Sequence, residues 1–444
     1  MAEGLGEFVS LVHENEDADS VAGRDGGVPE ELIALGTDHF ASWSAAREYK
    51  GSTFELQLHE EVIDLYRALR PTHAEAALRE AVVGAVRELL ERLFPTAQLH
   101  AFGSYASSLY LPSSDIDLVA LHTGATCKAE QVHALERIAH ALRSAPWGAE
   151  NIEVIGKAKV PIVKFRHSSS KMEVDICLDQ RDGLKSCALA RKAYQKFPAF
   201  KYLVPLLKHW LIRRGLNDTF TGGVGSFLLQ LMVVSSLQNP PAPPAVRVLK
   251  GNLGATLLHF FEVYGLRLNY ETTGFAIADG GRFYAKWEQG FGDKTRPYLL
   301  SAENPIDKKV DVGHNAFNIR AVRSACAHSY RSLLAAGAAL EHLPPRPLSL
   351  LSYILGPELE AEMQSRFRLH EEEALAPPSI SVGLPAAVEP VAADANGHPK
   401  PEPSPASPKR RRHGAAEGPE PFTLDAGSGS DAERYGGESE SEGD

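Results

Sequence analysis

The stretch 102–118 constrains the fold most, because it places two carboxylates one residue apart in an otherwise apolar segment. Side chains alternate between the two faces of a β-strand, so we expect Ile116 and Leu118 to enter a core while Asp115 and Asp117 share the other face. Two carboxylates at this spacing, about 7 Å along a strand, repel each other unless a cation lies between them. Hard oxygen ligands of this kind suit Mg²⁺. The stretch therefore indicates a divalent-metal site, with a solvated aspartate pair in a turn as the alternative.

A second predicted strand supplies a third carboxylate. Polar and apolar side chains alternate from Lys171 to Leu178, which is the pattern of a half-buried strand, and Asp175 lies on the polar face. If this strand neighbours the first, three carboxylates could hold two divalent ions, the arrangement needed for in-line displacement at phosphorus. The turn at Gly103-Ser104 adds backbone and hydroxyl donors of the kind that bind phosphate oxygens.

Composition and charge limit the class of protein. The 444 residues have room for two domains plus tails, and the net charge of −11 excludes a globally basic RNA-binding protein. RNA would need a local groove or a basic partner. The four cysteines form no C-x-x-C pair, which fits reduced, structural thiols. No run of about 18 apolar residues is present, so we expect a soluble intracellular protein without membrane contact.

Helical periodicity dominates outside the two strands. Thr72 and Glu75 form a capping-box pattern ahead of a helix whose predicted core stripe comprises Leu78, Val82, Val86, Leu89 and Leu93. Further helices are predicted over 199–214, 227–237 and 317–339, and Pro205 is expected to be tolerated only near a first turn. A glycine loop at 221–225 precedes the second of these helices. Residues 348–355 are predicted to be the last packed segment.

The ordered motifs resemble a known family. The pattern G-S-x-x-x-x-L-x-L-P-x-S-D-I-D-L from Gly103, followed by V-D-I at 174–176, resembles the nucleotidyltransferases of the DNA polymerase β superfamily. Within it, the chain is similar to the nuclear-surveillance, TRAMP-type poly(A) RNA polymerases. The resemblance runs from about 58 to 355 and includes the motifs at 58–61, 157–164, 208–211, 214–218, 221–226 and 311–313.

The resemblance implies an α+β fold with two domains. It implies a polymerase-β-like palm, a mixed sheet with helices, over 72–190. A mainly helical central domain would comprise 51–71 and 191–360 and would therefore be discontinuous in sequence. Residues 1–50 and 376–444 are expected to be disordered because their composition is rich in Gly, Pro, Ala, Ser and Glu.

The resemblance also implies the roles of individual residues. Asp115, Asp117 and Asp175 would be catalytic and would hold Mg²⁺ or Mn²⁺, with ATP as substrate. The nucleotide would contact a larger set, in which Phe227 replaces the usual Tyr as the base-stacking ring: Gly103, Ser104, Gly183, Lys208, Ser226, Phe227, Asn304 and Asp307. An ordinary turn before a helix is the alternative for the glycine loop, and core packing is the alternative for Phe227, Asn304 and Asp307.

The predicted nucleotide-recognition loop departs from the family pattern. Val310 replaces the usual Asn, and His314 replaces the usual Arg. Val310 cannot donate a hydrogen bond to a base edge, and relatives that select UTP often carry His there. We therefore expect ATP to be preferred over UTP, with discrimination between bases relaxed.

The implied function is template-independent addition of AMP to RNA 3′ ends in nuclear RNA surveillance. Weak intrinsic RNA affinity is expected, with a zinc-knuckle RNA-binding protein and an RNA helicase as partners. The basic cluster at 408–413 indicates import into the nucleus or a phosphate contact. The alternatives are a uridylyltransferase or mixed-nucleotide enzyme, a small-molecule nucleotidyltransferase, and a catalytically inactive scaffold that binds RNA or partners.

Overall fold

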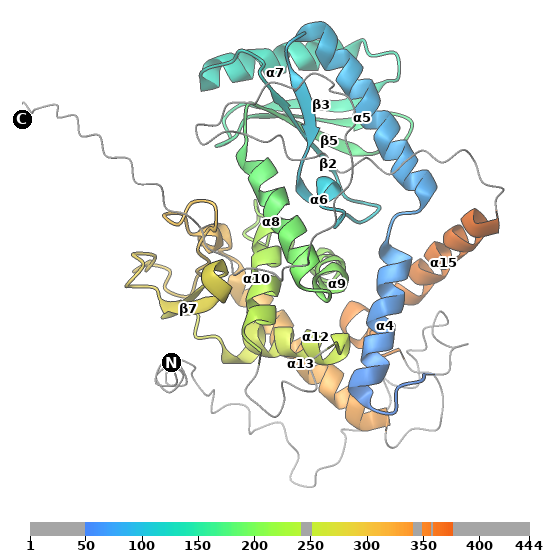
Figure 1. Ribbon diagram of the computed structural model, residues 1–444, viewed down its shortest axis with the longest axis vertical. Helices are drawn as coiled ribbons and strands as arrows, with labels where there is room; N and C mark the ends of the chain where they lie inside the picture. Colours follow the sequence, from blue (N-terminus) through green and yellow to red (C-terminus); the bar gives the residue numbers. More distant parts are fainter. Residues whose placement is uncertain (1–48, 241–250, 341–348, 357, 376–444) are drawn as a thin grey trace, which may run out of the picture. The chain divides into compact units, whose positions relative to one another are not determined.

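The computed structural model describes residues 49–240, 251–340, 349–356 and 358–375 (Figure 1). The two segments expected to be disordered, apart from residues 49 and 50, and the basic cluster at 408–413 lie outside the described residues. The α+β architecture expected from the sequence is confirmed, since a mixed sheet and a larger set of helices make up the described chain.

A five-stranded sheet forms the palm. Its strand order is β1-β2-β5-β4-β3. The strands are β1 (Gln98–Ala101), β2 (Ile116–Leu121), β3 (Ala149–Ile155), β4 (Ile162–His167) and β5 (Glu173–Leu178). Strands β2 and β5 are parallel, and the other neighbours are antiparallel. The two strands predicted to carry the carboxylates are therefore adjacent.

Helices α5 (His73–Leu93) and α7 (Lys128–Arg143) cover one face of this sheet and share its core. The predicted capping box between Thr72 and Glu75 is present at the start of α5. The predicted core stripe of α5 is wrong at one end, because Leu78 is 43% exposed while the neighbouring Arg79 is 1% exposed. Arg79 is buried because its guanidinium finds backbone acceptors inside the palm.

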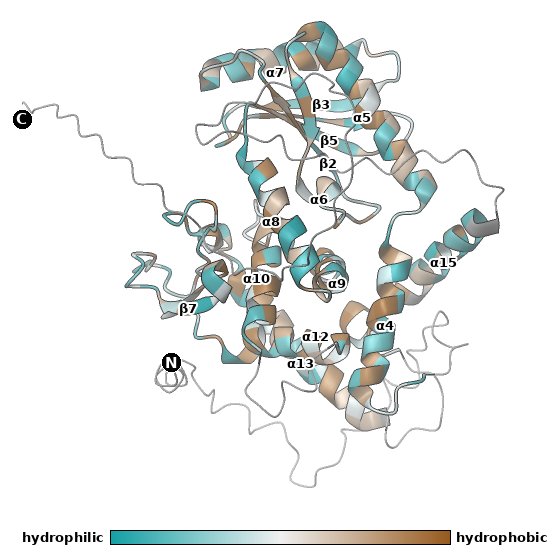
Figure 2. Cartoon of the chain, in the orientation of Figure 1, coloured by the Kyte–Doolittle hydropathy of each residue, from teal (hydrophilic) through white to brown (hydrophobic). Residues whose placement is uncertain are grey.

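Short α6 (Gly103–Ala106) precedes β2, and α8 (Asp182–Lys196) leads out of the palm into the helical part. That part contains α9 (Phe200–Ile212), α10 (Ser226–Gln238), α12 (Leu253–Glu262), α13 (Ile319–Leu340) and α14 (Ser352–Leu355). Hydrophobic residues predominate along α10 (Figure 2), because this helix is buried nearly all round. Pro205 is the sixth residue of α9 rather than part of its first turn, so burial of the surrounding side chains outweighs its missing N–H.

The first described helix, α4 (Phe54–Leu69), packs on α9 and α12 although it precedes the palm in sequence. Its carboxylate Glu61 is buried and accepts hydrogen bonds from the backbone N–H groups of Leu350 and Leu351. These contacts fit the expected discontinuous domain, whose boundaries stay a prediction.

The prediction that packing ends near residue 355 is wrong. Helix α15 (Leu359–Leu375) packs on α4, with Leu359 and Met363 fully buried. Arg366 donates hydrogen bonds to the Ala68 and Arg70 carbonyls, and the Glu373 carboxylate accepts from two N–H groups at the start of α5. The apolar residues of α15 are spread over several faces among many charged ones, so periodicity indicates this helix only weakly.

A two-stranded sheet of β6 (Thr273–Ala276) and β7 (Arg282–Ala285) supports the predicted nucleotide-recognition loop. Single-turn helices lie at Val263–Arg267, Ala278–Gly280 and Val312–Asn315. No helix in the described part of the chain is long and apolar enough to cross a membrane.

Candidate active site

The parallel register of β2 and β5 sets two of the predicted carboxylates side by side. Asp117 and Asp175 are paired positions in the two strands. Ile116 and Leu118 are fully buried on the opposite face, as expected, with α5 and α7 packed over them. Asp115 lies immediately before β2. The strand alternation therefore brings all three carboxylates to one edge of the palm.

Two of the carboxylates at this edge have raised pKa values. Burial, and then the charges of Asp175 and Asp115, raise the pKa of Asp117 to about 7. Burial also raises the pKa of Asp175, against the opposing effect of Lys164. Carboxylates with pKa values raised in this way are poorly solvated anions that a cation would stabilise.

Lys164 is the neighbour that sequence reasoning did not assign to the site. It pairs with Asp175 across the antiparallel β4–β5 ladder. Its Nζ lies 3.4 Å from Asp115 Oδ2 and 3.6 Å from Asp175 Oδ1. The second distance is too long for a hydrogen bond, and Asp175 Oδ1 is buried without a hydrogen-bond partner. Burial lowers the pKa of Lys164, but the two aspartates outweigh this and raise it.

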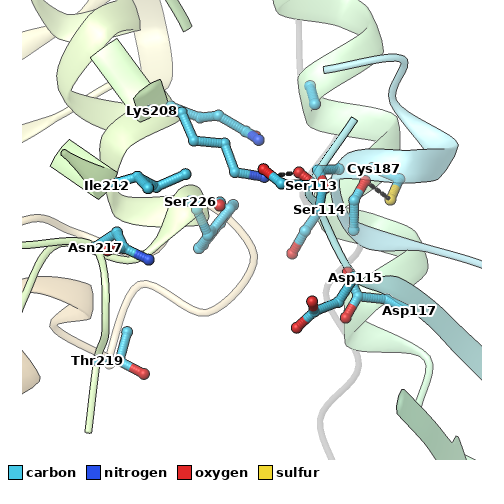
Figure 3. Close-up of a pocket in the computed structure, with 16 residues that line it drawn as sticks. Ser113, Ser114, Asp115, Asp117, Cys187, Lys208, Ile212, Asn217, Thr219 and Ser226 are labelled. Atoms are coloured by element: carbon cyan, nitrogen blue, oxygen red, sulfur yellow. Dashed lines mark hydrogen bonds between the residues drawn. The ribbon is translucent and has the colours of Figure 1, made fainter. Parts of the chain in front are cut away.

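A cavity of about 440 Å³ is lined by two of the carboxylates, Asp115 and Asp117, while Asp175 lies outside its lining. Figure 3 shows Lys208, Asn217 and Ser226 on one side of it and Ser114, Asp115 and Asp117 on the other. The remaining lining residues come from both parts of the chain and are Gly103, Ser104, Ser113, Ser186, Cys187, Ala190, Ile212, Thr219, Phe227 and Gln230. The cavity thus combines anionic, cationic and hydroxyl groups in one volume that polar ligands could occupy.

Lys208 reaches the cavity from α9. Its Nζ donates a 2.8 Å hydrogen bond to Ser114 Oγ, in the loop before Asp115. Burial lowers the pKa of Lys208, while Asp117 and Asp115 oppose that effect. Ser226 is the first residue of α10, directly after the glycine loop, as the sequence predicts. A cation and a helix N-terminus therefore face the carboxylates across the cavity.

The carboxylates fit a divalent cation by their chemistry. All three donors are hard oxygens, and the unpartnered Asp175 Oδ1 is a buried acceptor without a donor. Gly103 has a φ of 64°, and a Cβ there would overlap the Asp117 carboxylate, so glycine lets the turn approach this group. Among the described residues, no three His, Cys, Asp or Glu side chains lie close enough together to form a metal site without moving. Lys164 instead lies between Asp115 and Asp175.

Arg79 fixes the loop that carries these groups. Its Nη2 donates to the carbonyls of Pro112 and Ser114 at 2.6 and 2.9 Å, and more weakly to Leu111 at 3.4 Å. The guanidinium also lies 4.9 Å from the ring centroid of Tyr110. The same loop presents Ser114 to Lys208. In the sequence, Arg79 is one arginine within a helical pattern, and periodicity alone could not show that its side chain points inward.

Three predicted nucleotide contacts lie outside the cavity. Gly183, in the first turn of α8, lies against the Phe102 ring, where a Cβ would overlap it. Asn304 Oδ1 accepts from the Ile306 N–H, and Asp307 Oδ1 accepts from the Lys309 N–H. These side chains hold their own loop, and their nucleotide contacts stay a prediction.

Two family models match the chain. One is described as the central palm domain of the mitochondrial-like poly(A) RNA polymerases and matches residues 58–195. The other is described as the Cid1 family poly A polymerase and matches residues 252–309. The first covers the three carboxylates, and the second covers β6, β7 and the predicted recognition loop only as far as residue 309.

A fission-yeast relative, the poly(A) RNA polymerase cid14 of Schizosaccharomyces pombe, is 34% identical over 61% of this chain and 40% of its own length. The chain thus spans well under two thirds of that relative. The solved polymerase core of TRAMP, an RNA surveillance complex, matches with a TM-score of 0.61 and 26% identity, over 74% of this chain and 100% of that one.

A solved structure of the Cid1 poly(U) polymerase matches with a TM-score of 0.53 over 63% of this chain and 94% of that one. Its identity is 22%, so it supports the fold alone. The family models, the cid14 relative and the TRAMP core agree with the motifs of the palm. The chain is thus similar to the TRAMP-type poly(A) RNA polymerases, and its palm matches the family model of poly(A) RNA polymerase palm domains.

Proposed function

We propose that the chain is a template-independent RNA 3′-terminal adenylyltransferase. The observation that carries the proposal is the pairing of Asp117 with Asp175 on parallel strands, next to a cavity that also contains Lys208 and Ser226. Carboxylates that hold metal ions, placed opposite a cation and a helix N-terminus, suit a triphosphate and an attacking hydroxyl. The named activity of the cid14 relative supports adenylation.

In this reaction the RNA 3′-oxygen forms a bond to the α-phosphorus of ATP, and the bond from that phosphorus to the β-phosphate oxygen breaks, releasing pyrophosphate. Asp115 and Asp117 would hold both divalent ions, and Asp175 would hold the one near the 3′-hydroxyl. When bound, Mg²⁺ or Mn²⁺ supplies charge stabilisation at the reacting phosphoryl group. The hydroxyl proton leaves to Asp175 or to solvent.

The other lining residues orient the nucleotide. The Lys208 ammonium offsets triphosphate charge, and Ser104 and Ser226 donate hydroxyl hydrogen bonds to phosphate oxygens. Gly103 lets the backbone of the turn approach the same oxygens. The Phe227 ring stacks on the base, because every base offers a π-face. Asn304 and Asp307 supply polar contacts from the recognition loop.

ATP is the preferred substrate in this proposal. Val310, 36% exposed, offers no side-chain donor or acceptor to a base, and its backbone pairs with Asn304 and Asp307. A histidine at this position would favour UTP in the family, and this chain lacks it. Addition of UMP or of mixed nucleotides is the competing function.

The proposed setting is nuclear RNA surveillance, with the RNA supplied by a zinc-knuckle RNA-binding protein and an RNA helicase. The net charge of −11 supports dependence on a basic partner for RNA delivery. The TRAMP polymerase core, to which this chain is similar, acts within an RNA surveillance complex.

Primer extension tests the proposal. A labelled oligo(A) RNA is incubated with the protein, Mg²⁺ or Mn²⁺ and each NTP singly, beside the Asp115→Ala/Asp117→Ala variant. We expect a ladder with ATP that disappears in the variant. A ladder with UTP alone would contradict the base assignment and leave the chemistry in place. No ladder with any NTP, even after the zinc-knuckle partner is added, would contradict the enzyme and favour a scaffold.

A further inference from the structure

Two further cavities continue outward from the catalytic one. The second, of about 370 Å³, is lined by Thr219, Phe220, Arg296, His314, Asn315 and Phe317. The third, of about 510 Å³, is lined by Gly290, Phe291, Gly292, Asp293, Lys294, Lys309, Asp311 and His314. Thr219 lines the first and second cavities, and His314 lines the second and third. Neighbouring cavities share a lining residue, so the three lie next to one another along a groove that starts at Asp115 and Asp117.

Aromatic rings line the outer part of this groove. Phe220 is 91% exposed and Phe317 is 47% exposed, although both are large apolar side chains. Phe317 lies against the glycine loop, where a Cβ at Gly222 would overlap its ring, and the Asn318 N–H donates to the Gly222 carbonyl. The ring is thus held in place while one side faces the groove. Exposed rings in fixed positions are suited to stack on unpaired bases.

Basic side chains line the same cavities as the aromatic rings. Lys294, Arg296 and Lys309 line the second and third cavities. Within the described residues neither lysine takes part in an ion pair. The acidic groups nearby are engaged locally, since Asp293 accepts from the Thr295 and Arg296 N–H groups, and Asp311 accepts from the Ala302 and Gly313 N–H groups. Arg296 forms an ion pair with Asp293 at 3.2 Å, so Lys294 and Lys309 are the basic side chains of this described lining that remain outside ion pairs, and they lie near exposed aromatic rings.

We propose that the outer groove, defined by Phe220, Phe317, Lys294, Arg296 and Lys309, binds the single-stranded acceptor RNA behind its 3′ nucleotide. Bases stack on the two phenylalanines, and phosphates lie along the three basic side chains. Interleaved rings and cations are the combination that binds single strands without reading their sequence. This inference rests on the proposed function for the direction of the strand, because its 3′ end must reach the carboxylates.

Fluorescence anisotropy tests the groove without catalysis. The full chain is titrated into a labelled oligo(A) of about 15 nucleotides at about 50 mM salt, with no NTP. We expect Phe220→Ala to weaken RNA binding about tenfold, since stacking stabilises each base substantially. Phe220→Tyr should bind like the wild type. Trp287→Ala is the matched control, because Trp287 is 75% exposed and lines none of the three cavities.

The basic side chains are tested by salt dependence. Removing two phosphate contacts from a single strand should lower the slope of log affinity against log salt by about 1.4. We expect that change for Lys294→Gln/Lys309→Gln. The Arg143→Gln/Lys171→Gln variant loses the same charge from exposed positions of the palm and should keep the wild-type slope.

Extension kinetics separate the two proposals. If the wild type extends RNA, Phe220→Ala should raise the KM for RNA and leave the KM for ATP unchanged. Active protein with equal RNA affinity in all variants, or no RNA binding by the wild type at low salt, would overturn the groove. Wild type that binds RNA through Phe220 but adds no nucleotide would support the groove and overturn the enzymatic proposal.

Discussion

Two buried cations, one in each part of the molecule, hold backbone carbonyls in the same way with different chemistry. Arg79 on α5 donates to Leu111, Pro112 and Ser114, next to the carboxylates. Lys286, directly after β7, donates to the carbonyls of Tyr270, Pro297 and Leu299, below the recognition loop. Their side chains belong to residues that are 1% and 4% exposed.

The two cations differ in whether they can lose a proton near neutral pH. The Arg79 guanidinium is planar, stacks on Tyr110 and stays protonated at any working pH. The Lys286 ammonium is a point donor, and burial lowers its pKa to about 8. The loop that carries the catalytic groups is thus held by a permanently charged donor, and the recognition loop is held by an amine donor whose protonation depends on pH. Four substitutions or conditions examine this contrast.

The largest effect is expected for Arg79→Met. Three buried carbonyls would lose their donor, so we expect the free energy of unfolding to fall by about 3 kcal/mol. The loop before Asp115 would shift, and displacement of catalytic groups by about 1 Å can lower a rate by about a hundredfold. Urea denaturation and extension kinetics measure the two effects. Arg87→Met, an exposed arginine of the same helix, is the control; a rate for Arg79→Met within threefold or so of it would break the comparison.

Lys286→Met should cost stability but little activity. Its three carbonyl partners also lose a donor, so we expect a loss of about 2 kcal/mol in the free energy of unfolding. Because none of them lines the catalytic cavity, the rate of AMP addition should change by only a few fold. Lys308→Met, in an exposed position of the nearby loop, should match the wild type. Loss of activity as large as in Arg79→Met would show that the two cations are equivalent.

Arg79→Lys tests geometry against charge. Lysine keeps the positive charge but cannot offer the planar fork or the same stacking on Tyr110. We expect the extension rate to fall about tenfold, with a smaller loss of stability than in Arg79→Met. Equal rates for Arg79→Lys and the wild type, measured under single-turnover conditions, would mean that charge alone holds the loop.

The smallest effect is the pH dependence of Lys286. Its pKa is about 8 in the folded protein and lies near 10.5 for an ordinary lysine, so between these values the unfolded chain binds more protons. The contribution of this group to the free energy of unfolding therefore rises with pH from about 8 to 10.5, by up to about 1.4 kcal/mol per pH unit. In urea denaturation, the stability difference between the wild type and Lys286→Met should therefore widen as the pH rises through this range, because only the wild type gains. A difference between the two that is constant across this range would refute the assignment.

Much of the palm site follows from local patterns. Alternation placed Asp117 and Asp175 on one face, and the glycine loop located the start of α10 at Ser226. These features depend on neighbours in the chain, which periodicity and capping rules describe well. That the two strands are neighbours was a hypothesis, and the register of β2 with β5 confirms it.

Other features depend on contacts between distant segments. Lys164 lies next to Asp175 only because of the β4–β5 register. Arg79, rather than Leu78, points into the palm because carbonyls of residues 111–114 accept its hydrogen bonds there. Helix α15 buries Leu359 and Met363, and Arg366 and Glu373 add hydrogen bonds to α4 and to the start of α5. Asn304 and Asp307 lie in a polar loop, and their side chains accept hydrogen bonds from N–H groups of the same loop. No pattern within a short window distinguishes these cases.

The contact between α15 and the start of α5 has a consequence for synthesis on the ribosome. The Glu373 carboxylate accepts a hydrogen bond from the His73 N–H, 300 residues earlier in the chain. At about 5–20 residues per second, the start of α5 emerges roughly 15–60 s before this cap exists. Within that interval the palm strands are made first, then α9 and α12, and α15 comes last, so the apolar face of α4 gains its packing partners late. The nascent chain therefore exposes the apolar face of α4 during translation. We expect its yield in cells to depend on chaperones that shield this face until translation ends.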